Sequence, residues 1–152
     1  MAVLTAPVRA LLAPERVLIG LDEPAREGVI ERLVTVCADH PAVLDLETVR
    51  EAVLARERRM STGVGNGVAL PHAKTDAVRE PVAALAVSSV PVDFETLDGL
   101  PVRLIYLLLS PDDTPARHVK LLGRISRAFN TATIRSQLLQ AGSVDAALAA
   151  FE

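Results

Sequence analysis

The sequence has few aromatic residues and a single cysteine. Among its 152 residues are three phenylalanines, one tyrosine and no tryptophan. The core must therefore be aliphatic, and nucleic-acid binding on stacked aromatic platforms is excluded. One cysteine, Cys37, excludes an internal disulfide and a cysteine-built zinc site. Because it lies within an apolar helical pattern, Cys37 is interpreted as a small core residue.

The chain also lacks an excess of positive charge and any long hydrophobic run. Its formal net charge is −3 and its isoelectric point is about 5.6, which argues against binding to a phosphate backbone. No apolar run approaches the roughly 20 residues that span a bilayer. The apolar start, Met1–Ala13, is short and includes Arg9, so it is not interpreted as a signal peptide. We expect a cytoplasmic protein with no nucleic-acid partner and no membrane insertion.

What the sequence does contain is material for one folded domain. Half of the residues are hydrophobic and 23% are charged, a composition typical of a globular chain of this length. We expect a single domain over residues 1–152 with its core at about residues 10–150. Residues 1–9 are expected to be extended and loosely held.

Helical periodicity alternates with short apolar runs along the chain. Strands are predicted at residues 17–19, 68–70, 82–87 and 102–109; the last is almost continuously apolar, as in a strand covered on both faces. Helices are predicted to begin after N-caps at Asp22, Asp45, Thr114, Thr131 and Ser143, with the first ending at His40 and Pro41. The order favours an α/β fold, a single domain whose mixed β-sheet is flanked by α-helices on both sides.

The three histidines have different surroundings. His40 precedes a proline at a predicted helix end, where its side chain is expected to interact with the last carbonyls. His118 lies in the first turn of an amphipathic helix, where a surface or partly buried histidine is ordinary. His72 follows the glycine-rich loop of residues 61–67, a brief strand and Pro71. The end of a strand beside such a loop is a common place for a functional side chain.

Familiar catalytic patterns are missing around His72. No lysine follows the glycines as in a phosphate-binding loop, and their spacing does not match a dinucleotide fingerprint. No His-x-x-Glu or His-x-x-x-His pattern suggests a metal site, and no Gly-x-Ser-x-Gly pattern suggests a serine hydrolase. The remaining interpretation is an imidazole that is itself the nucleophile.

The run from Arg56 to Lys74, RERRMSTGVGNGVALPHAK, closely resembles the active-site signature of one class of phosphotransferase-system EIIA proteins. This is the fructose, mannitol and nitrogen-regulatory class. The stretch from Leu104 to Pro111 and the stretch from His118 to Ile125 resemble that family's second-histidine segment. The resemblance covers about residues 10–150, and it implies a mixed sheet with helices on its flanks.

The resemblance also implies a function. His72 would accept a phosphoryl group from a histidine-phosphorylated carrier protein and pass it to a cysteine or histidine of a downstream protein. His118 would be the companion histidine that helps to hold the phosphoryl oxygens, and Arg56 would supply supporting charge. No metal or other cofactor is implied.

Phosphoryl transfer between proteins requires mainly positioning and charge stabilisation. The attacking imidazole must be neutral, which is easily met at pH 7. Its other nitrogen should be held by a backbone carbonyl of the glycine loop. The expected additional donors to the phosphoryl oxygens are Ser61, Thr62, Gly63, Gly65, Asn66 and Gly67. Arg56, Arg58, Arg59 and Lys74 make this neighbourhood locally basic.

Three functions remain open from the sequence. The Gly65-Asn66-Gly67 motif and a chain length that suits a standalone domain favour a regulatory protein of the nitrogen-regulatory type. The same chemistry would serve an EIIA subunit for fructose or mannitol uptake. The third is a non-catalytic interaction module with a degenerate site, which would acquire no phosphate.

Overall fold

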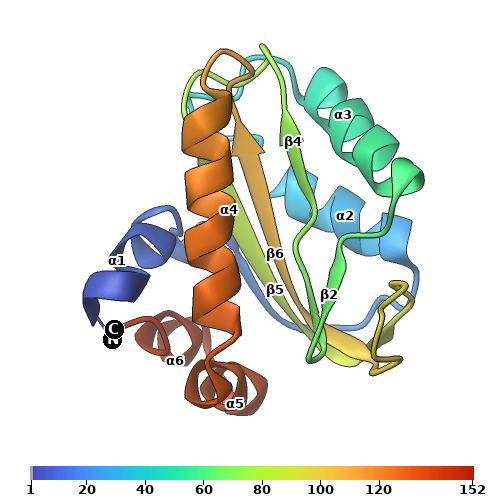
Figure 1. Ribbon diagram of the computed structural model, residues 1–152, viewed down its shortest axis with the longest axis vertical. Coiled ribbons are helices and arrows are strands. Elements are labelled where there is room, and N and C mark those ends of the chain that lie inside the picture. Colours follow the sequence, from blue (N-terminus) through green and yellow to red (C-terminus); the bar gives the residue numbers. More distant parts are fainter. Residues whose placement is uncertain (1) are drawn as a thin grey trace.

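The computed structural model describes residues 2–152, with side chains from Thr5 onward. The helices are α1 (Ala2–Ala10), the 3-10 turn η1 (Pro14–Arg16), α2 (Arg26–Thr35), α3 (Leu46–Arg59), α4 (Pro115–Phe129), α5 (Ala132–Gln140) and α6 (Val144–Ala149). The strands are β1 (Val17–Leu21), β2 (Gly63–Gly65), β3 (Val68–Ala69), β4 (His72–Lys74), β5 (Val82–Val92) and β6 (Val102–Ser110). Figure 1 shows how these elements surround one sheet.

The sheet is mixed, and its strand order is β1-β5-β6-β3-β2. β5 and β6 are antiparallel, whereas β1 runs parallel to β5. β3 and then β4 pair in parallel with successive parts of β6. The two short strands therefore lie on the same side of β6, β3 with β2 outside it and β4 at the edge. The connection between them contains Pro71, whose carbonyl accepts from the Leu108 N–H at 3.0 Å.

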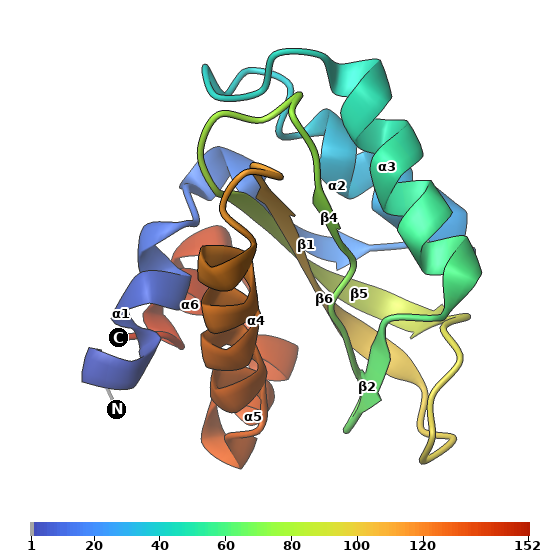
Figure 2. The ribbon, with the colours of Figure 1, turned by 45° about the horizontal axis from the view of Figure 1, so that its top comes forward.

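Helices cover both faces of this sheet, as predicted. α2 and α3 cover one face, and α1, α4, α5 and α6 cover the other (Figures 1 and 2). Side chains of β6 alternate between the two cores. Ile105, Leu107 and Leu109 pack on the α2–α3 side, while Leu104, Tyr106 and Leu108 pack on the α4 side. Both faces are buried, which explains the continuous apolar run in this strand.

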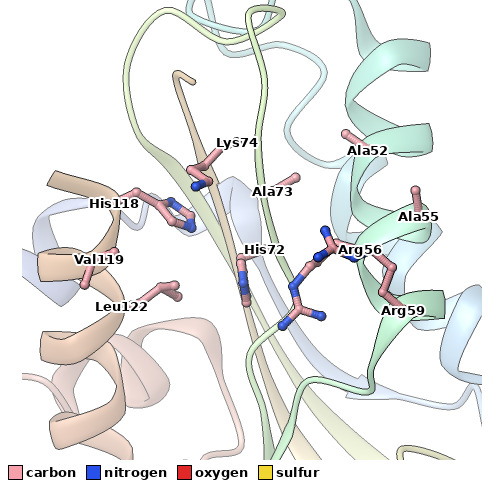
Figure 3. Close-up of a pocket in the computed structure, with 10 residues that line it drawn as sticks. All are labelled: Ala52, Ala55, Arg56, Arg59, His72, Ala73, Lys74, His118, Val119 and Leu122. Carbon is pink, nitrogen blue, oxygen red and sulfur yellow. The ribbon is translucent and has the colours of Figure 1, made fainter. Parts of the chain in front are cut away.

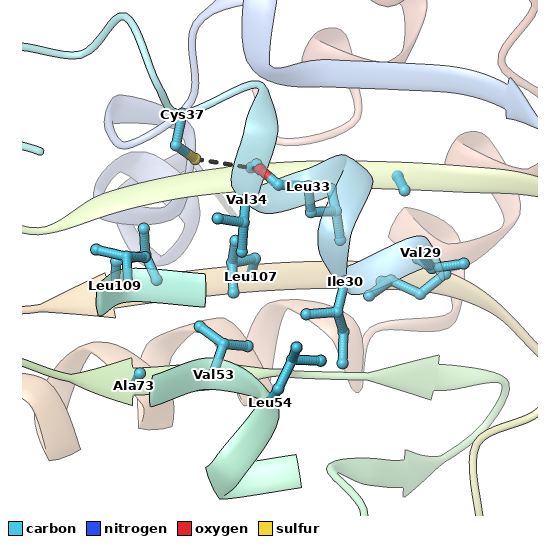
Figure 4. Close-up of a cluster of buried hydrophobic side chains, with 14 of the residues drawn as sticks. Val29, Ile30, Leu33, Val34, Cys37, Val53, Leu54, Ala73, Leu107 and Leu109 are labelled. Atoms are coloured by element: carbon cyan, nitrogen blue, oxygen red, sulfur yellow. Dashed lines mark hydrogen bonds between the residues drawn. The ribbon is translucent and has the colours of Figure 1, made fainter. Parts of the chain in front are cut away.

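Cys37 is a core residue, as predicted. It is fully buried beside α2, where its thiol lies 3.4 Å from the Leu33 carbonyl (Figure 4). Burial raises the pKa of the thiol to about 12, so it stays protonated and unreactive at neutral pH.

The prediction of an extended start is wrong. Residues 2–10 form α1, which packs beside α4 (Figure 2). Val8 is buried in the core on that side, and its carbonyl accepts from the Tyr106 hydroxyl at 2.9 Å. Thr5 donates to the carbonyl of Phe151. Tertiary packing of this kind stabilises short helices whose local sequence signal is weak.

Local predictions had mixed outcomes. Asp45 and Ser143 are N-caps whose side chains accept backbone N–H groups. Thr114 and Thr131 occupy N-cap positions without a side-chain bond. The N-cap predicted at Asp22 is wrong, because α2 begins at Arg26 after an extended Ala25, and it ends at Thr35, before His40. His40 contacts no terminal carbonyl through its ring; its Nδ1 accepts from the Ala42 N–H at 3.0 Å.

Candidate active site

The short strand β4 places His72 at the edge of the sheet. His72 pairs in register with Leu108, and Lys74 pairs with Ser110. Because side chains alternate along a strand, Ala73 enters the α2–α3 core while His72 and Lys74 face the α4 side. The Nδ1 atom of His72 lies 2.8 Å from the carbonyl oxygen of Leu70. A carbonyl only accepts, so Nδ1 carries the proton and the unprotonated nitrogen is Nε2.

The predicted glycine loop is a tight β-hairpin formed by β2 and β3. Its turn uses left-handed backbone at Gly65, Asn66 and Gly67, with φ values of 93°, 57° and 76°, a conformation that favours glycine. At Gly63 a Cβ atom would lie 2.4 Å from the Glu95 carbonyl oxygen. Glycine is therefore required there for close packing, and the run predicted as a glycine-rich loop forms a hairpin beside His72.

His118 lies in the first turn of α4 and is only 3% exposed. Its Nδ1 lies 2.6 Å from the Ser110 hydroxyl at the end of β6. Its Nε2 is buried and has no hydrogen-bond partner among the described residues. The ring points toward His72 (Figure 3), and the two ring centroids are 5.4 Å apart. A buried, unpaired ring nitrogen beside a partly exposed imidazole suggests a place for a ligand atom.

Both histidines are held neutral near pH 7. Burial, with smaller contributions from the neighbouring His72 and Lys74, lowers the pKa of His118 from 6.5 to about 4. Burial is also the main cause that lowers the pKa of His72. The Leu70 hydrogen bond opposes that shift, and Arg56 adds to it. The pair thus offers an unprotonated imidazole rather than an imidazolium.

Three cationic side chains border the histidine pair. Arg56 and Arg59 reach from α3 around the edge strand, and Lys74 comes from β4 (Figure 3). Among the side chains of residues 5–152, none of the three forms an ion pair. The hollow is lined by Ala52, Ala55, Arg56, Arg59, His72, Ala73, Lys74, His118, Val119 and Leu122. Its charge and shape suit an anionic group.

A more apolar groove adjoins this hollow at His72. It runs between the β2 hairpin and α4, and it is lined by Arg56, Met60, Ser61, Thr62, Gly63, Val64, Leu70, His72, Leu122, Gly123 and Ser126. Met60 is 70% exposed and Val64 is 53% exposed. Exposed apolar side chains around a reactive group are typical of a surface that a partner covers.

No three side chains of the His, Cys, Asp and Glu types gather where they could hold a metal ion in residues 5–152. None of the helices within residues 2–152 combines the length and the apolar character needed to cross a bilayer.

Comparison with known proteins identifies the family. Residues 10–152 match the family described as "Phosphoenolpyruvate-dependent sugar phosphotransferase system, EIIA 2". The chain belongs to this family. EIIA proteins are phosphotransfer components, so this chain has the family's phosphotransferase character.

The EIIA relatives carry two kinds of name. A "Nitrogen regulatory protein" from Pseudomonas aeruginosa is 34% identical over 136 residues, which is 90% of this chain and 88% of that protein. A "PTS system fructose-specific EIIA component" from Haloferax volcanii is 39% identical over 128 residues, 83% of each chain. In the "PTS system fructose-specific EIIABC component" of Bacillus subtilis, a 36% identical match over 139 residues covers 91% of this chain but only 22% of that protein.

Solved EIIA structures share the fold. The nitrogen regulatory protein IIA-Ntr from Neisseria meningitidis superimposes with a TM-score of 0.87 at 27% identity, covering 95% of this chain and 99% of that one. The enzyme IIA of the mannitol system from Escherichia coli, solved in complex with phosphorylated enzyme IIB, gives a TM-score of 0.80 at 20% identity, with 92% and 96% coverage. The mixed sheet with helices on both faces is thus the EIIA fold.

Not all sequence-predicted site residues of this EIIA protein meet at the histidine pair. His72, His118 and Arg56 line one hollow, and Ser61, Thr62 and Gly63 line the adjoining groove. Gly65 and Asn66 border a separate hollow with Asn130, and the Asn66 N–H donates to Asp98 at 2.8 Å. The Gly67 carbonyl accepts from Leu104. The hairpin turn therefore shapes the sheet edge and does not point at the histidines.

The predicted donor role of Thr62 also conflicts with the structure. Its N–H and its hydroxyl both donate to the buried carboxylate of Glu57, so neither is available to a phosphoryl oxygen. The hydroxyl oxygen of Ser61 accepts from the N–H of Glu95 at 3.1 Å and borders the groove.

Sequence reasoning missed two residues of the EIIA site. Ser110, which holds His118 Nδ1, ends an apolar strand and carries no local signal. Glu57 lies in the charged run Arg56–Arg59, which looks like a solvated helix face, yet it is only 4% exposed. Lys74 and Arg59 were predicted only as local positive charge, and the structure places both beside the histidines.

Proposed function

We propose that this protein is a phosphocarrier that accepts a phosphoryl group on Nε2 of His72 from a histidine-phosphorylated carrier protein. One observation carries the proposal: Leu70 holds Nδ1 of a partly exposed imidazole, and the neighbouring ring of His118 has an unpartnered, buried Nε2. The first contact leaves Nε2 of His72 free to attack. The second supplies a position for a phosphoryl oxygen.

The transfer exchanges one nitrogen–phosphorus bond for another. The lone pair of His72 Nε2 attacks phosphorus while the bond to the carrier's imidazole breaks, and that imidazole leaves with the bonding pair. The proton stays on His72 Nδ1, which donates it to the Leu70 carbonyl in a hydrogen bond. The ring, which was neutral, therefore takes up the positive charge of the new bond without a separate base. Little other covalent work is needed, because such transfers depend on alignment and charge stabilisation.

The surroundings of His72 supply that stabilisation. When the Ser110 hydroxyl donates to His118 Nδ1, the proton of the neutral His118 ring lies on Nε2 and can be donated to a phosphoryl oxygen. Arg56, Arg59 and Lys74 add positive charge at the rim. In a partly buried site, fixed donors of this kind stabilise developing negative charge more strongly than water does.

The groove beside His72 is proposed as the place where partner proteins dock. Its exposed Met60 and Val64 would be covered transiently, first by the phosphorylated carrier and then by the acceptor. The name of the EIIABC relative joins EIIA to further components, and the mannitol IIA was solved with phosphorylated IIB. By analogy, the acceptor proposed here is an EIIB-type protein or a regulatory target. The proposal includes a cytoplasmic location.

A regulatory destination is favoured over sugar uptake by one comparison. The match spans 99% of the IIA-Ntr chain, and that structure superimposes on this one with a TM-score of 0.87. The sugar-uptake alternative retains the support of the fructose-specific relative, which is 39% identical. A phosphate chase decides between them, since efficient onward transfer to an EIIB component would contradict a purely regulatory role.

The test of the proposed function is phosphorylation by a purified, phosphorylated carrier protein. We expect wild-type protein to gain one phosphoryl group that is acid-labile and base-stable. His40→Ala is the matched control, because His40 borders a different hollow, and it should be phosphorylated normally. A protein that gains no phosphate would instead be a non-catalytic module.

A further inference from the structure

Glu57 is a buried carboxylate beside a site that we expect to receive a phosphoryl dianion. It is 4% exposed, follows Arg56 in α3, and lies close enough for its charge to raise the pKa of His72. A negative charge there opposes the incoming group. Its burial is also unfavourable unless hydrogen bonds compensate it. The position of this carboxylate therefore calls for a function.

The hydrogen bonds of Glu57 link the end of α3 to the start of β2. The Thr62 N–H lies 3.1 and 3.2 Å from its two oxygens, and the Thr62 hydroxyl donates at 2.6 Å. The Arg26 guanidinium of α2 lies 3.7 Å away, and its side chain is 30% exposed. These charge-assisted bonds fix Thr62 from two directions.

From Thr62 a chain of backbone hydrogen bonds continues to His72. The carbonyl of Thr62 accepts from the Leu70 N–H at 3.0 Å, and the carbonyl of Leu70 holds His72 Nδ1 at 2.8 Å. The Leu70 carbonyl sets which ring nitrogen is protonated. A displacement of Thr62 would therefore move the Leu70 carbonyl, and that carbonyl holds the ring of His72.

The same carboxylate also controls the position of Arg56. Its bonds to Thr62 close the short loop of residues 60–61 that follows α3. Within that loop the carbonyl of Met60 accepts from the Arg56 guanidinium at 2.8 Å. A loop released from Glu57 would no longer present this carbonyl in a fixed place.

We propose that Glu57 is a positioning residue for phosphoryl transfer: through Thr62 it fixes the tautomer and ring orientation of His72, and through the 60–61 loop it fixes the guanidinium of Arg56. This inference rests on the proposed function of His72. It assigns Thr62 to the support of the nucleophile rather than to phosphoryl binding.

Three variants separate geometry from charge. Glu57→Ala removes every bond to Thr62. Glu57→Gln removes the charge but keeps an oxygen that accepts from the Thr62 N–H, and its amide can donate to the Thr62 hydroxyl. Thr62→Val removes only the hydroxyl. Glu51→Gln is the matched control, because Glu51 is an exposed acid on the same helix.

The first measurement uses unphosphorylated protein and needs no carrier. Nitrogen-15 shifts of the His72 imidazole report which nitrogen carries the proton. We expect a single Nδ1–H tautomer in wild type, Glu51→Gln and Glu57→Gln, and a mixture of tautomers in Glu57→Ala. Failure of the proposed function would appear separately, as wild-type protein that shows this tautomer yet accepts no phosphate.

The second measurement is the single-turnover rate of phosphoryl acceptance. For folded Glu57→Ala we expect the rate at saturating carrier to fall roughly 10- to 100-fold. The carrier concentration that gives the half-maximal rate should change by less than about threefold. Glu57→Gln should stay within about threefold of wild type. A folded Glu57→Ala with the wild-type tautomer and rate would overturn the proposal, and so would a Glu57→Gln that is as slow as Glu57→Ala.

The pH dependence gives a further readout for Glu57→Gln. The charged or titratable groups around His72 are Arg56, Arg59 and Glu57 from α3, Lys74 from β4 and His118 from α4. Glu57 is the negative one, so its neutralisation should move the acid limb of the rate profile to lower pH. Should Glu57→Ala not fold, Thr62→Val decides, since a wild-type tautomer and rate there would also overturn the proposal.

Discussion

The imidazole rings of His72 and His118 lie with their centroids 5.4 Å apart and their planes inclined by 50°, although they come from β4 and α4. Ser110 explains how this pair is built. It is the register partner of Lys74 in β4 and it holds His118 Nδ1. The end of β6 therefore fixes both histidines relative to each other.

Replacement of His118 by alanine should slow phosphoryl acceptance without preventing it. The variant loses one buried donor to the phosphoryl oxygens but keeps the nucleophile, so we expect a rate about 10² to 10³ times lower. Single-turnover kinetics with the phosphorylated carrier measure this directly. Wild-type rates in His118→Ala would leave His118 with a structural role alone.

The pH profile of acceptance should lack a transition near the usual histidine pKa. The reactive form of His72 is neutral, and burial lowers the pKa of its ring below 6.5. The rate should therefore stay constant from pH 8 to about 6.5 and fall only at lower pH. Because Lys74 contributes to the lowered pKa of His72, Lys74→Gln should move this acid limb to higher pH. A limb unchanged in that variant, or a rate that falls with rising pH, would contradict this interpretation.

Stability should depend on pH through the buried His118. Its pKa is lowered from 6.5 to about 4 in the folded protein, so the unfolded chain binds the proton more readily. The stabilisation is complete above about pH 6.5 and is lost as the pH falls toward 4, by up to about 3 kcal/mol. Urea unfolding at several pH values measures it. The decline should be smaller in His118→Gln, and an equal decline in both proteins would be evidence against this origin.

Gly123 should affect stability and partner binding in opposite directions. It lies inside α4, where a Cβ atom would meet nothing within 4 Å. Gly123→Ala should therefore stabilise the fold by up to about 1 kcal/mol. It also lines the groove beside His72, so a partner that packs closely there should bind more weakly. Thermal unfolding and the carrier concentration for half-maximal rate test both effects; unchanged carrier binding would place the docking surface elsewhere.

The sequence was most informative where burial imposes a simple pattern. The apolar run of β6, the N-caps at Asp45 and Ser143 and the burial of Cys37 all follow from local chemistry. The helix α1 could not be predicted in this way, because its stability depends on contacts with distant elements such as Tyr106. Residues 61–67 looked like a flexible loop, since glycine marks both loose segments and tight hairpins.

For the site, the Pro71-His72 signature and its distance to His118 predicted the pair that the structure brings together. The supporting residues were harder to predict. Glu57 has charged neighbours in sequence and is buried only because α2, α3 and β2 converge on it. Thr62 looked like a donor, but its donors are already used by that carboxylate. Contacts between helices and strands decide whether such side chains are buried and which partners they bind. These contacts leave no local signal in the sequence.

The most direct test of the central claim is the intact mass of the protein after exposure to the phosphorylated carrier, with the modified residue mapped. We predict the mass of one added phosphoryl group, located on His72, and no gain in a folded His72→Ala variant. Because His72 is a partly exposed edge residue, its truncation should change stability little. A protein that gains no phosphate, or that carries it on another residue, would contradict the claim.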